Sequence, residues 1–382
     1  MTNRIGWRSA AAVGMAVGAL AFAACGSDDD SDTTAATTGG GEASATTVSE
    51  GSAGDATAIV EEATADIAYE GPTSGPAPEP DKQIAVIPCA AAASGCVRVA
   101  DGATEAAKQI GWKVRTLDGQ GQASTQNSAI QQAVSQGVDG IVLVAIDSSS
   151  VSQGLAAAKQ ANIPVVSIQA DNEVGEGANA VTAEPASGST RAGEALGAFA
   201  VADSDGAAKV ATLSTTELAV TRNRTDAFIE QVEACEGCEV VKQETYLLSS
   251  AIKDVPLKVS SMLQANPDIE YLFVDVGQFG ALATQAIDQA GKDVKVLSVD
   301  CNPDDIENIA NDTANVACAG HALETGGYAA LAALNFAFAD ETAAAEELVV
   351  PTKLITADNL PSEPVWKGDF DPTEAYAELW GK

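Results

Sequence analysis

The fold is decided by residues 125–168, which read TQNSAIQQAVSQGVDGIVLVAIDSSSVSQGLAAAKQANIPVVSI. Apolar side chains recur at helical spacing over Thr125–Gln136, and the glycine that follows ends this helix because glycine adopts the left-handed conformation at little cost. Gly140–Ala145 is an apolar run of strand length, which predicts a strand buried on both faces. A second helix over Ser149–Gln160 and a second strand over Pro164–Ile168 follow. The stretch therefore predicts a parallel sheet with helices on both faces.

The same alternation extends in both directions from this stretch. Upstream it predicts strands over 84–87 and 113–117 and a helix over 97–110. Downstream it restarts, with predicted helices over 189–201, 222–235, 254–265 and 281–290 and strands over 209–213, 240–246, 271–276 and 295–299. The fold class is therefore α/β, with two doubly wound, Rossmann-like lobes joined by a hinge and a binding site between them. We assign 82–186 plus roughly 320–348 to the first lobe, and 187–319 plus roughly 349–382 to the second.

The N-terminal residues have the pattern of an export signal. Arg4 and Arg8 precede a run of small apolar residues over Ala10–Ala23, which is too short for a comfortable membrane span. The run ends at Cys25 in a pattern that resembles a bacterial lipobox. We predict a signal peptide over 1–24 and a lipidated Cys25 that anchors the exported protein to the outer face of the cell membrane. The alternative is a plain secretory signal with an incidental cysteine.

Residues 25–81 have the composition of a tether. The chain carries no Lys or Arg between Arg8 and Lys82, while Asp, Thr, Gly and Pro are frequent there. Such a segment buries too little apolar surface to fold alone, so we predict a disordered acidic tether in which 56–68 has the pattern of a short helix.

Export also changes how the remaining six cysteines are interpreted. An even number outside the cell favours disulfides, and six cysteines permit 15 pairings. Proximity in the chain favours three pairs, which are Cys89 with Cys96, Cys235 with Cys238, and Cys301 with Cys318. The Cys235–Cys238 spacing also fits a redox motif or half a zinc site, but no second such motif follows and a structural disulfide is favoured.

Composition and motifs argue against several classes of protein. The formal net charge of −34, with no basic cluster, argues against nucleic-acid binding. The sequence holds no nucleophile-elbow pattern, no phosphate-binding loop and no metal-binding cluster, and His321 is its single histidine. We therefore expect a monomeric binding protein rather than an enzyme, without a metal or cofactor.

Four phrases occur in the order found in periplasmic sugar-binding proteins of the ribose and galactose type. They are QGVDGI at 136–141, AAAKQANIPVV at 156–166, QANPDI at 264–269 and VLSVD at 296–300. The chain resembles this family over roughly Lys82–Pro361. The resemblance implies the type 1 periplasmic binding protein fold and a small-molecule ligand in the interlobe cleft.

In that family, polar side chains at the strand ends bind sugar hydroxyls, and an aromatic pair after the first strand sandwiches the ring. The resemblance and the strand ends together imply seven ligand-binding candidates, which are Gln169, Asp171, Arg222, Asp275, Gln278, Asp300 and His321. The loop Ala90–Gly95 holds no aromatic residue. A pyranose is therefore only one possible ligand, beside a modified or acyclic polyol, a small carbonyl compound or an apolar-edged metabolite.

Six of the seven candidates also have a structural alternative. Ion pairing with surface acids is the alternative for Arg222, helix capping for Asp275, Gln278 and Asp300, turn formation for Asp171, and core packing for His321.

The sequence thus leads to an extracytoplasmic solute-binding lipoprotein of an ABC-type importer. Its partners would be a sugar or sugar-like ligand, the transporter permease and, through the lipid, the membrane. The alternative is a ligand-sensing lipoprotein that presents a bound signal molecule to a membrane receptor.

Overall fold

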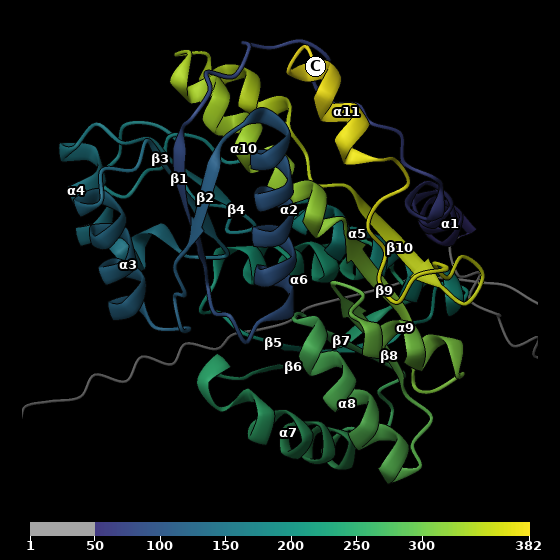
Figure 1. Ribbon diagram of the computed structural model, residues 1–382. Coiled ribbons are helices and arrows are strands. Elements are labelled where there is room, and N and C mark those ends of the chain that lie inside the picture. Colours follow the sequence, from purple (N-terminus) through teal and green to yellow (C-terminus); the bar gives the residue numbers. More distant parts are fainter. Residues whose placement is uncertain (1–49) are drawn as a thin grey trace, which may run out of the picture. The chain divides into compact units, whose positions relative to one another are not determined.

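The computed structural model describes residues 50–382, which are built around two β-sheets (Figure 1). The predicted signal peptide, Cys25 and the first part of the predicted tether lie outside the described residues. The first sheet has the order β2-β1-β3-β4 and is parallel throughout. Its strands are β1 (Gln83–Pro88), β2 (Lys113–Thr116), β3 (Gly140–Val144) and β4 (Val165–Ile168).

The second sheet has the order β10-β9-β8-β7-β5-β6, and only β10 runs antiparallel to its neighbour. Its strands are β5 (Lys209–Ser214), β6 (Glu239–Thr245), β7 (Tyr271–Val274), β8 (Lys295–Val299), β9 (Asn315–His321) and β10 (Thr352–Thr356).

Helices cover both faces of the first sheet because β1, β3 and β4 are buried on both sides, whereas the edge strand β2 is largely exposed. Ile84 and Val86 of β1 pack with α2 (Ser94–Ile110) and α10 (Leu323–Phe338), whereas Ala85 and Ile87 pack with α3 (Ala123–Ser135) and α4 (Ser152–Gln160). Since successive strand residues point to opposite faces, the apolar run of β1 serves two cores at once.

The second sheet is enclosed in the same way. One core contains α5 (Ser189–Asp203) and α6 (Ala219–Glu233), and the core on the other face contains α7 (Ala251–Ala265) and α8 (Gly277–Ala290). The short helix α9 (Pro303–Ala310) lies against β9 and α8. Its start is fixed by Asn302, which forms a capping box with Asp305 ahead of Pro303.

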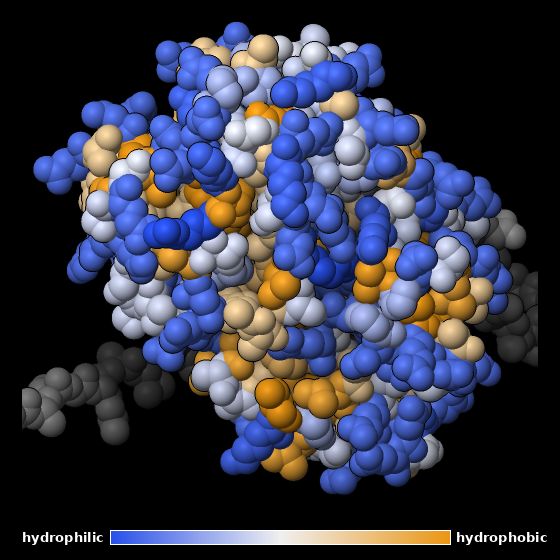
Figure 2. Space-filling model, in the orientation of Figure 1, coloured by the Kyte–Doolittle hydropathy of each residue, from blue (hydrophilic) through white to orange (hydrophobic). Residues whose placement is uncertain are grey.

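The surface is largely hydrophilic on the face that Figure 2 shows, with scattered apolar residues. The large hydrophobic side chains that are exposed among residues 53–382 are Val174, Leu247, Ile252, Leu257 and Val349. No helix in the described part of the chain combines the length and apolar character that crossing a bilayer demands.

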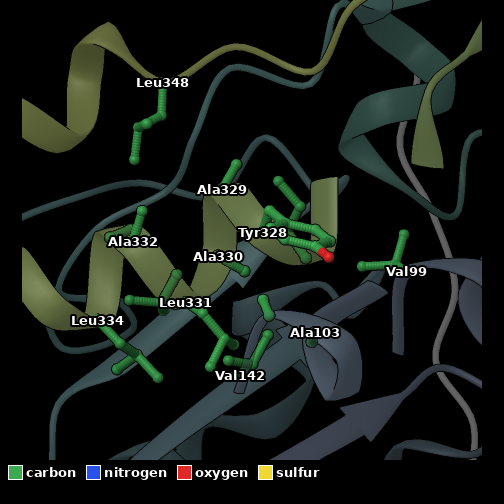
Figure 3. Close-up of a cluster of buried hydrophobic side chains, with 14 of the residues drawn as sticks. Val99, Ala103, Val142, Tyr328, Ala329, Ala330, Leu331, Ala332, Leu334 and Leu348 are labelled. Atoms are coloured by element: carbon green, nitrogen blue, oxygen red, sulfur yellow. The ribbon is translucent and has the colours of Figure 1, made fainter. Parts of the chain in front are cut away.

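Helix α10 supplies the centre of the first lobe's core. It is apolar around most of its circumference, and its side chains from Leu323 to Phe336 are buried except that of Glu324. Figure 3 shows its residues beside Val99 and Ala103 of α2 and Val142 of β3. The helix is therefore enclosed on several sides, which explains why its sequence lacks a polar face.

The predicted fold class is confirmed, and most predicted boundaries agree with the structure within a few residues. The helix predicted over 97–110 begins at Ser94, and the one predicted over 281–290 begins at Gly277. The strand predicted over 295–299 has those bounds. The largest shifts occur at helix starts, because capping there depends on the preceding loop.

Apart from the N-terminal and C-terminal segments described below, the described chain passes between the two lobes at three places. These are the segments 184–188, 321–323 and 348–352, which connect β4 to α5, β9 to α10 and α10 to β10. Two of the segments hydrogen-bond to each other, since Ala186 N donates to Leu348 O at 2.9 Å and Val350 N donates to Ala186 O at 2.9 Å. Backbone hydrogen bonds thus join the first and third of these segments side by side.

Residues 50–81 do not match the predicted disordered tether. Helix α1 (Glu50–Thr64) packs on α5 and β10, with Ala56 and Ala63 buried. The segment 65–81 then contacts the first lobe, where Asn335 Nδ2 donates to Pro76 O at 2.6 Å. We call 65–81 the N-terminal strap. The short helix expected over 56–68 overlaps α1. The expected disorder is not found in residues 50–81, because composition measures what a segment buries alone, whereas this one adds its few apolar groups to existing cores.

The C-terminal residues also depart from the predicted division into lobes. Helix α11 (Pro372–Leu379) contacts α2 and α10 of the first lobe rather than the six-stranded sheet. Tyr376 and Trp380 belong to the same buried cluster as Tyr328 of α10. Tyr376 and Trp380 pack on this lobe because α2 and α10 present an apolar surface between them.

Candidate functional site

Polar residues follow the strands at the carboxyl edges of both sheets. Gln169 follows β4, Asp275 follows β7, Asp300 follows β8, and His321 ends β9. Gln169 and Asp300 have left-handed backbones, with φ of 60° and 68°. Such conformations are costly for residues with a side chain and gather at functional sites.

Arg224 on α6 is the central charged residue of this group. It is 4% exposed, and its Nη1 donates to the backbone oxygen of Asp275 at 2.9 Å. The same nitrogen lies 3.8 Å from Asp300 Oδ1. Within the described residues, Arg224 Nε has no hydrogen-bond partner. A buried guanidinium with an unused donor is costly, so this nitrogen is a natural contact for a ligand oxygen.

Asp275, whose backbone oxygen accepts from Arg224, is fully buried. Its carboxylate accepts hydrogen bonds from the Tyr246 hydroxyl at 2.6 Å and from Thr215 N at 2.7 Å. Burial raises the pKa of Asp275 to about 7, against the opposing effects of these hydrogen bonds and of Arg224. Since both of its carboxylate oxygens have protein partners, Asp275 supports the site structurally.

His321 is the second residue with an unused nitrogen. It is fully buried, its Nδ1 lies 2.9 Å from Thr352 Oγ1, and its Nε2 has no partner among the described residues. Burial, reinforced by Arg224, lowers the pKa of His321 to about 4. The imidazole is therefore neutral at pH 7 and can offer a hydrogen-bond donor or acceptor without adding charge.

Asp300 faces Arg224 and does not cap the next helix. Asn302 is the N-cap of α9, which leaves the Asp300 carboxylate available, with 21% of its side chain exposed. The charges of Arg224, Asp300 and Asp171 all influence the pKa of His321. The ion pair of Asp300 with Arg224 is the direct contact among these charged groups.

Asp171 joins the two lobes. Its Oδ2 accepts hydrogen bonds from Ser189 Oγ at 2.6 Å and from Asn223 Nδ2 at 2.8 Å, on α5 and α6. A second polar contact between the lobes is donated by Ser94 Oγ to Asn302 Oδ1 at 3.1 Å. Gln169 lies nearby, where its Nε2 donates to Ser187 O at 3.0 Å. The two lobes thus meet through hydrogen bonds made by Asn223 and Asn302, which lie next to Arg224 and close to Asp300 in the chain.

Two of the predicted residues lie outside this group. Arg222 is exposed and donates to Thr216 O at 2.7 Å, while Gln278 is exposed on α8 in a groove shared with α9. The sequence prediction omitted Arg224 as a ligand contact. A signal was available, because Thr221, Arg224 and Phe228 share the buried face of one helix at spacings of three and four residues.

The six cysteines form the three pairs that proximity favours. Cys89 is bonded to Cys96, Cys235 to Cys238, and Cys301 to Cys318, with Cα–Cα separations of 6.1, 5.3 and 5.4 Å. The first pair closes the alanine-rich loop after β1, and the third ties the loop after β8 to β9. Both therefore brace loops at the carboxyl edges where the polar groups gather.

The site contains no aromatic platform in the described part of the chain. Tyr246 packs edge-on against Phe279, and Phe228 stacks on Phe273 inside the second lobe. Residues 50–382 also contain no cluster of three His, Cys, Asp or Glu side chains suited to a metal ion. The chemistry that this arrangement offers is hydrogen bonding from two unused nitrogens and one carboxylate.

Two lobes built on mostly parallel sheets, with polar groups at the carboxyl edges of those sheets, define a small-molecule binding protein. The periplasmic binding protein domain matches residues 84–340, and the chain belongs to this family. It is a binding protein rather than an enzyme, as its relatives are.

Two relatives are ribose import binding proteins. The protein from Bacillus subtilis is 31% identical over 215 residues, which are 56% of this chain and 68% of the relative. The protein from Escherichia coli is 26% identical over 217 residues, which are 56% of this chain and 71% of the relative.

Solved structures share the fold. An ABC transporter solute-binding protein from Agrobacterium vitis, bound to α-D-tagatopyranose, has a TM-score of 0.67 and 18% identity over 75% of this chain and 98% of its own. Another, from Mycobacterium smegmatis with bound glycerol, has a TM-score of 0.62 and 24% identity over 75% of this chain and 99% of its own.

Proposed function

We propose that this chain is the extracytoplasmic solute-binding lipoprotein of an ABC-type importer, and that it captures a sugar or sugar-like molecule between its lobes. The observation that carries the proposal is the pair of unused nitrogens, Arg224 Nε and His321 Nε2, in the described site beside Asp300. A hydroxyl group both donates and accepts, so it can satisfy a guanidinium, a neutral imidazole and a carboxylate together.

The ligand class follows from what surrounds these groups. Alanines at 90–93, 145 and 170 occupy the loops after β1, β3 and β4, and no aromatic ring lies there to stack on a sugar face. A ligand of this site is therefore held by its hydroxyl edges. We infer an acyclic polyol or an open or furanose sugar in preference to a pyranose that depends on stacking.

Transport would follow from closure of the lobes around the ligand. The crossings at 184–188, 321–323 and 348–352 allow a hinge motion, and the ligand favours closure because it contacts both lobes only in the closed form. The closed protein would then dock on a permease, while the lipid on Cys25 would keep it at the membrane.

Arg224 and Arg222 provide a matched test. Arg224→Ala should weaken binding by at least about 100-fold, because it removes charge-assisted hydrogen bonds from a buried site, whereas Arg222→Ala should leave affinity unchanged. Calorimetry and thermal shift with acyclic polyols, furanoses and pyranoses provide the readout. Equal effects of the two variants would remove Arg224 from the site, and the absence of any stabilising small molecule would refute capture.

A further inference from the structure

Glu184 lies in the first segment that crosses between the sheets, and its carboxylate is surrounded by donors. Its Oε1 accepts hydrogen bonds from Ala170 N at 2.9 Å and Asp171 N at 2.6 Å. Its Oε2 accepts hydrogen bonds from Asn172 N at 2.8 Å and from the Ser167 hydroxyl. Only a carboxylate offers two acceptor oxygens without a donor, so no other side chain can serve all of these groups.

These donors belong to the turn that follows β4. Asp171 has a left-handed backbone with φ of 54°, which costs energy for a residue with a side chain. Asn172 extends the turn to the loop after β3, since its Oδ1 accepts from Ser148 N at 2.8 Å and its Nδ2 donates to Ile146 O at 2.9 Å. Glu184 therefore offsets the strain of a turn that links two strand ends.

The turn fixes the direction in which Asp171 points. Asp171 Oδ2 receives hydrogen bonds from Ser189 and Asn223, both on helices of the second lobe. Burial raises the pKa of Glu184, while the hydrogen bonds from Ser167, Ala170 and Asn172 act in the opposite direction. A change in the Glu184 carboxylate thus reaches the interlobe contact through the backbone of Asp171.

We propose that Glu184 is a positioning residue that acts through Asp171 to hold the two lobes close together and so sets the affinity of the site. The effect on affinity rests on the proposed function, whereas the effect on lobe spacing does not. The apparent dissociation constant of a ligand rises as the closed, binding-competent fraction falls. Loss of the contact between Asp171 and the second lobe should therefore weaken the binding of the ligand, even though the ligand does not touch Glu184.

The test measures lobe spacing without ligand and affinity with it. Fluorophores on unnatural amino acids at the exposed positions 160 in α4 and 252 in α7 report the spacing by energy transfer. Glu184→Gln keeps the side-chain size but turns one acceptor into a donor. We expect a longer distance in the ligand-free protein and a dissociation constant about tenfold higher. Asn223→Ala, which removes the exposed partner of Asp171, should produce both changes.

A double-mutant cycle separates positioning from general damage. If Glu184 acts through Asp171, adding Glu184→Gln to Asp171→Asn should change the spacing and the affinity by less than about twofold more. Asp371→Asn is the control, because Asp371 also holds a turn, by accepting from Thr373 N at 2.8 Å, but lies at the start of α11. It should lower stability slightly and leave the spacing unchanged.

Several outcomes would overturn the proposal. One is an unchanged lobe distance in both Glu184→Gln and Asn223→Ala. Another is a double variant of Glu184→Gln and Asp171→Asn whose effects on spacing and affinity are fully additive. If Glu184→Gln does not fold, Ser167→Ala removes one donor to Glu184 and must lengthen the distance instead. A wild-type protein that binds no sugar or polyol would refute the proposed function, while the ligand-free distances would still decide the role of Glu184.

Discussion

His321 occupies the end of β9 as a fully buried, neutral imidazole. It is the single histidine among the chain's 382 residues, so any imidazole resonance of the protein belongs to it. Its Nδ1 contacts Thr352, and the opposite nitrogen, Nε2, has no hydrogen-bond partner in the described structure. A neutral histidine adds hydrogen-bonding capacity beside Arg224 without repelling the guanidinium, which explains how the two groups coexist in one buried space.

The pKa of His321 gives a prediction with a definite sign. Burial lowers its pKa from 6.5 to about 4, so the folded protein resists protonation while the unfolded chain accepts it. The stability that the neutral imidazole preserves is complete above pH 6.5 and is lost as the pH falls from 6.5 toward 4. Carbon-13 NMR of the imidazole should therefore show a midpoint near 4 in the folded protein.

The matched comparison for this prediction is His321→Gln, which keeps hydrogen-bonding capacity but does not titrate. Its free energy of unfolding should fall less than that of the wild type between pH 6.5 and 4.5, as measured by urea denaturation. The urea-unfolded wild type should titrate near 6.5. A folded-state midpoint at or above 6.5 would contradict the assignment of a desolvated imidazole.

At the scale of elements, α1 and the N-terminal strap connect the two lobes outside the matched family domain. Asp66 forms an ion pair with Lys353 of β10 at 2.7 Å, and Trp112 Nε1 of the first lobe donates to Glu79 O at 2.7 Å. Between them, Tyr69 packs edge-on against Phe370 and Tyr376, with centroid distances of 5.4 Å. The strap therefore contacts both lobes, the second through Asp66 and the first through Glu79.

Tyr69 allows this contribution to be measured. Tyr69→Ala should lower the free energy of unfolding by about 3 kcal/mol, because it removes a large ring from an aromatic cluster. Tyr69→Phe is the control, since it loses only the hydrogen bond to Pro72 O at 3.0 Å and should cost about 1 kcal/mol. Chemical denaturation gives both values. Equal, small effects would show that the strap adds no stability and behaves as a tether.

At the scale of the whole molecule, the predicted anchor decides where the binding protein works. The pattern before Cys25 predicts cleavage and lipidation there, and the acyl chains would hold the chain at the membrane. Cys25→Ser should therefore move the exported protein from the membrane fraction to the soluble fraction, as detected by fractionation and immunoblotting. Cys238→Ser, which alters a cysteine of a disulfide, serves as the control and should stay with the membrane. A membrane-bound Cys25→Ser protein would contradict the lipid anchor.

Local patterns in the sequence were enough for the architecture. The alternation of helices and strands depends on apolar periodicity within about a dozen residues, and each unit from Gln83 to Val299 carries its own pattern. The cysteine pairs were also accessible, because the members of each pair are separated by 7, 3 and 17 residues. The carboxyl-edge position of Asp300 followed from the strand predicted over 295–299, whereas the strand that ends at His321 was not predicted.

Only the tertiary structure decided which side chains meet. Arg222 and Arg224 are two residues apart, yet helix α6 turns one to solvent and the other into the site, because packing against the sheet fixes its rotation. The joining of Glu184 to Asp171 and the docking of the strap also depend on segments far apart in the chain. The sequence by itself determined the two α/β lobes, since their patterns are local. The composition of the site required the fold, since its contacts are not local.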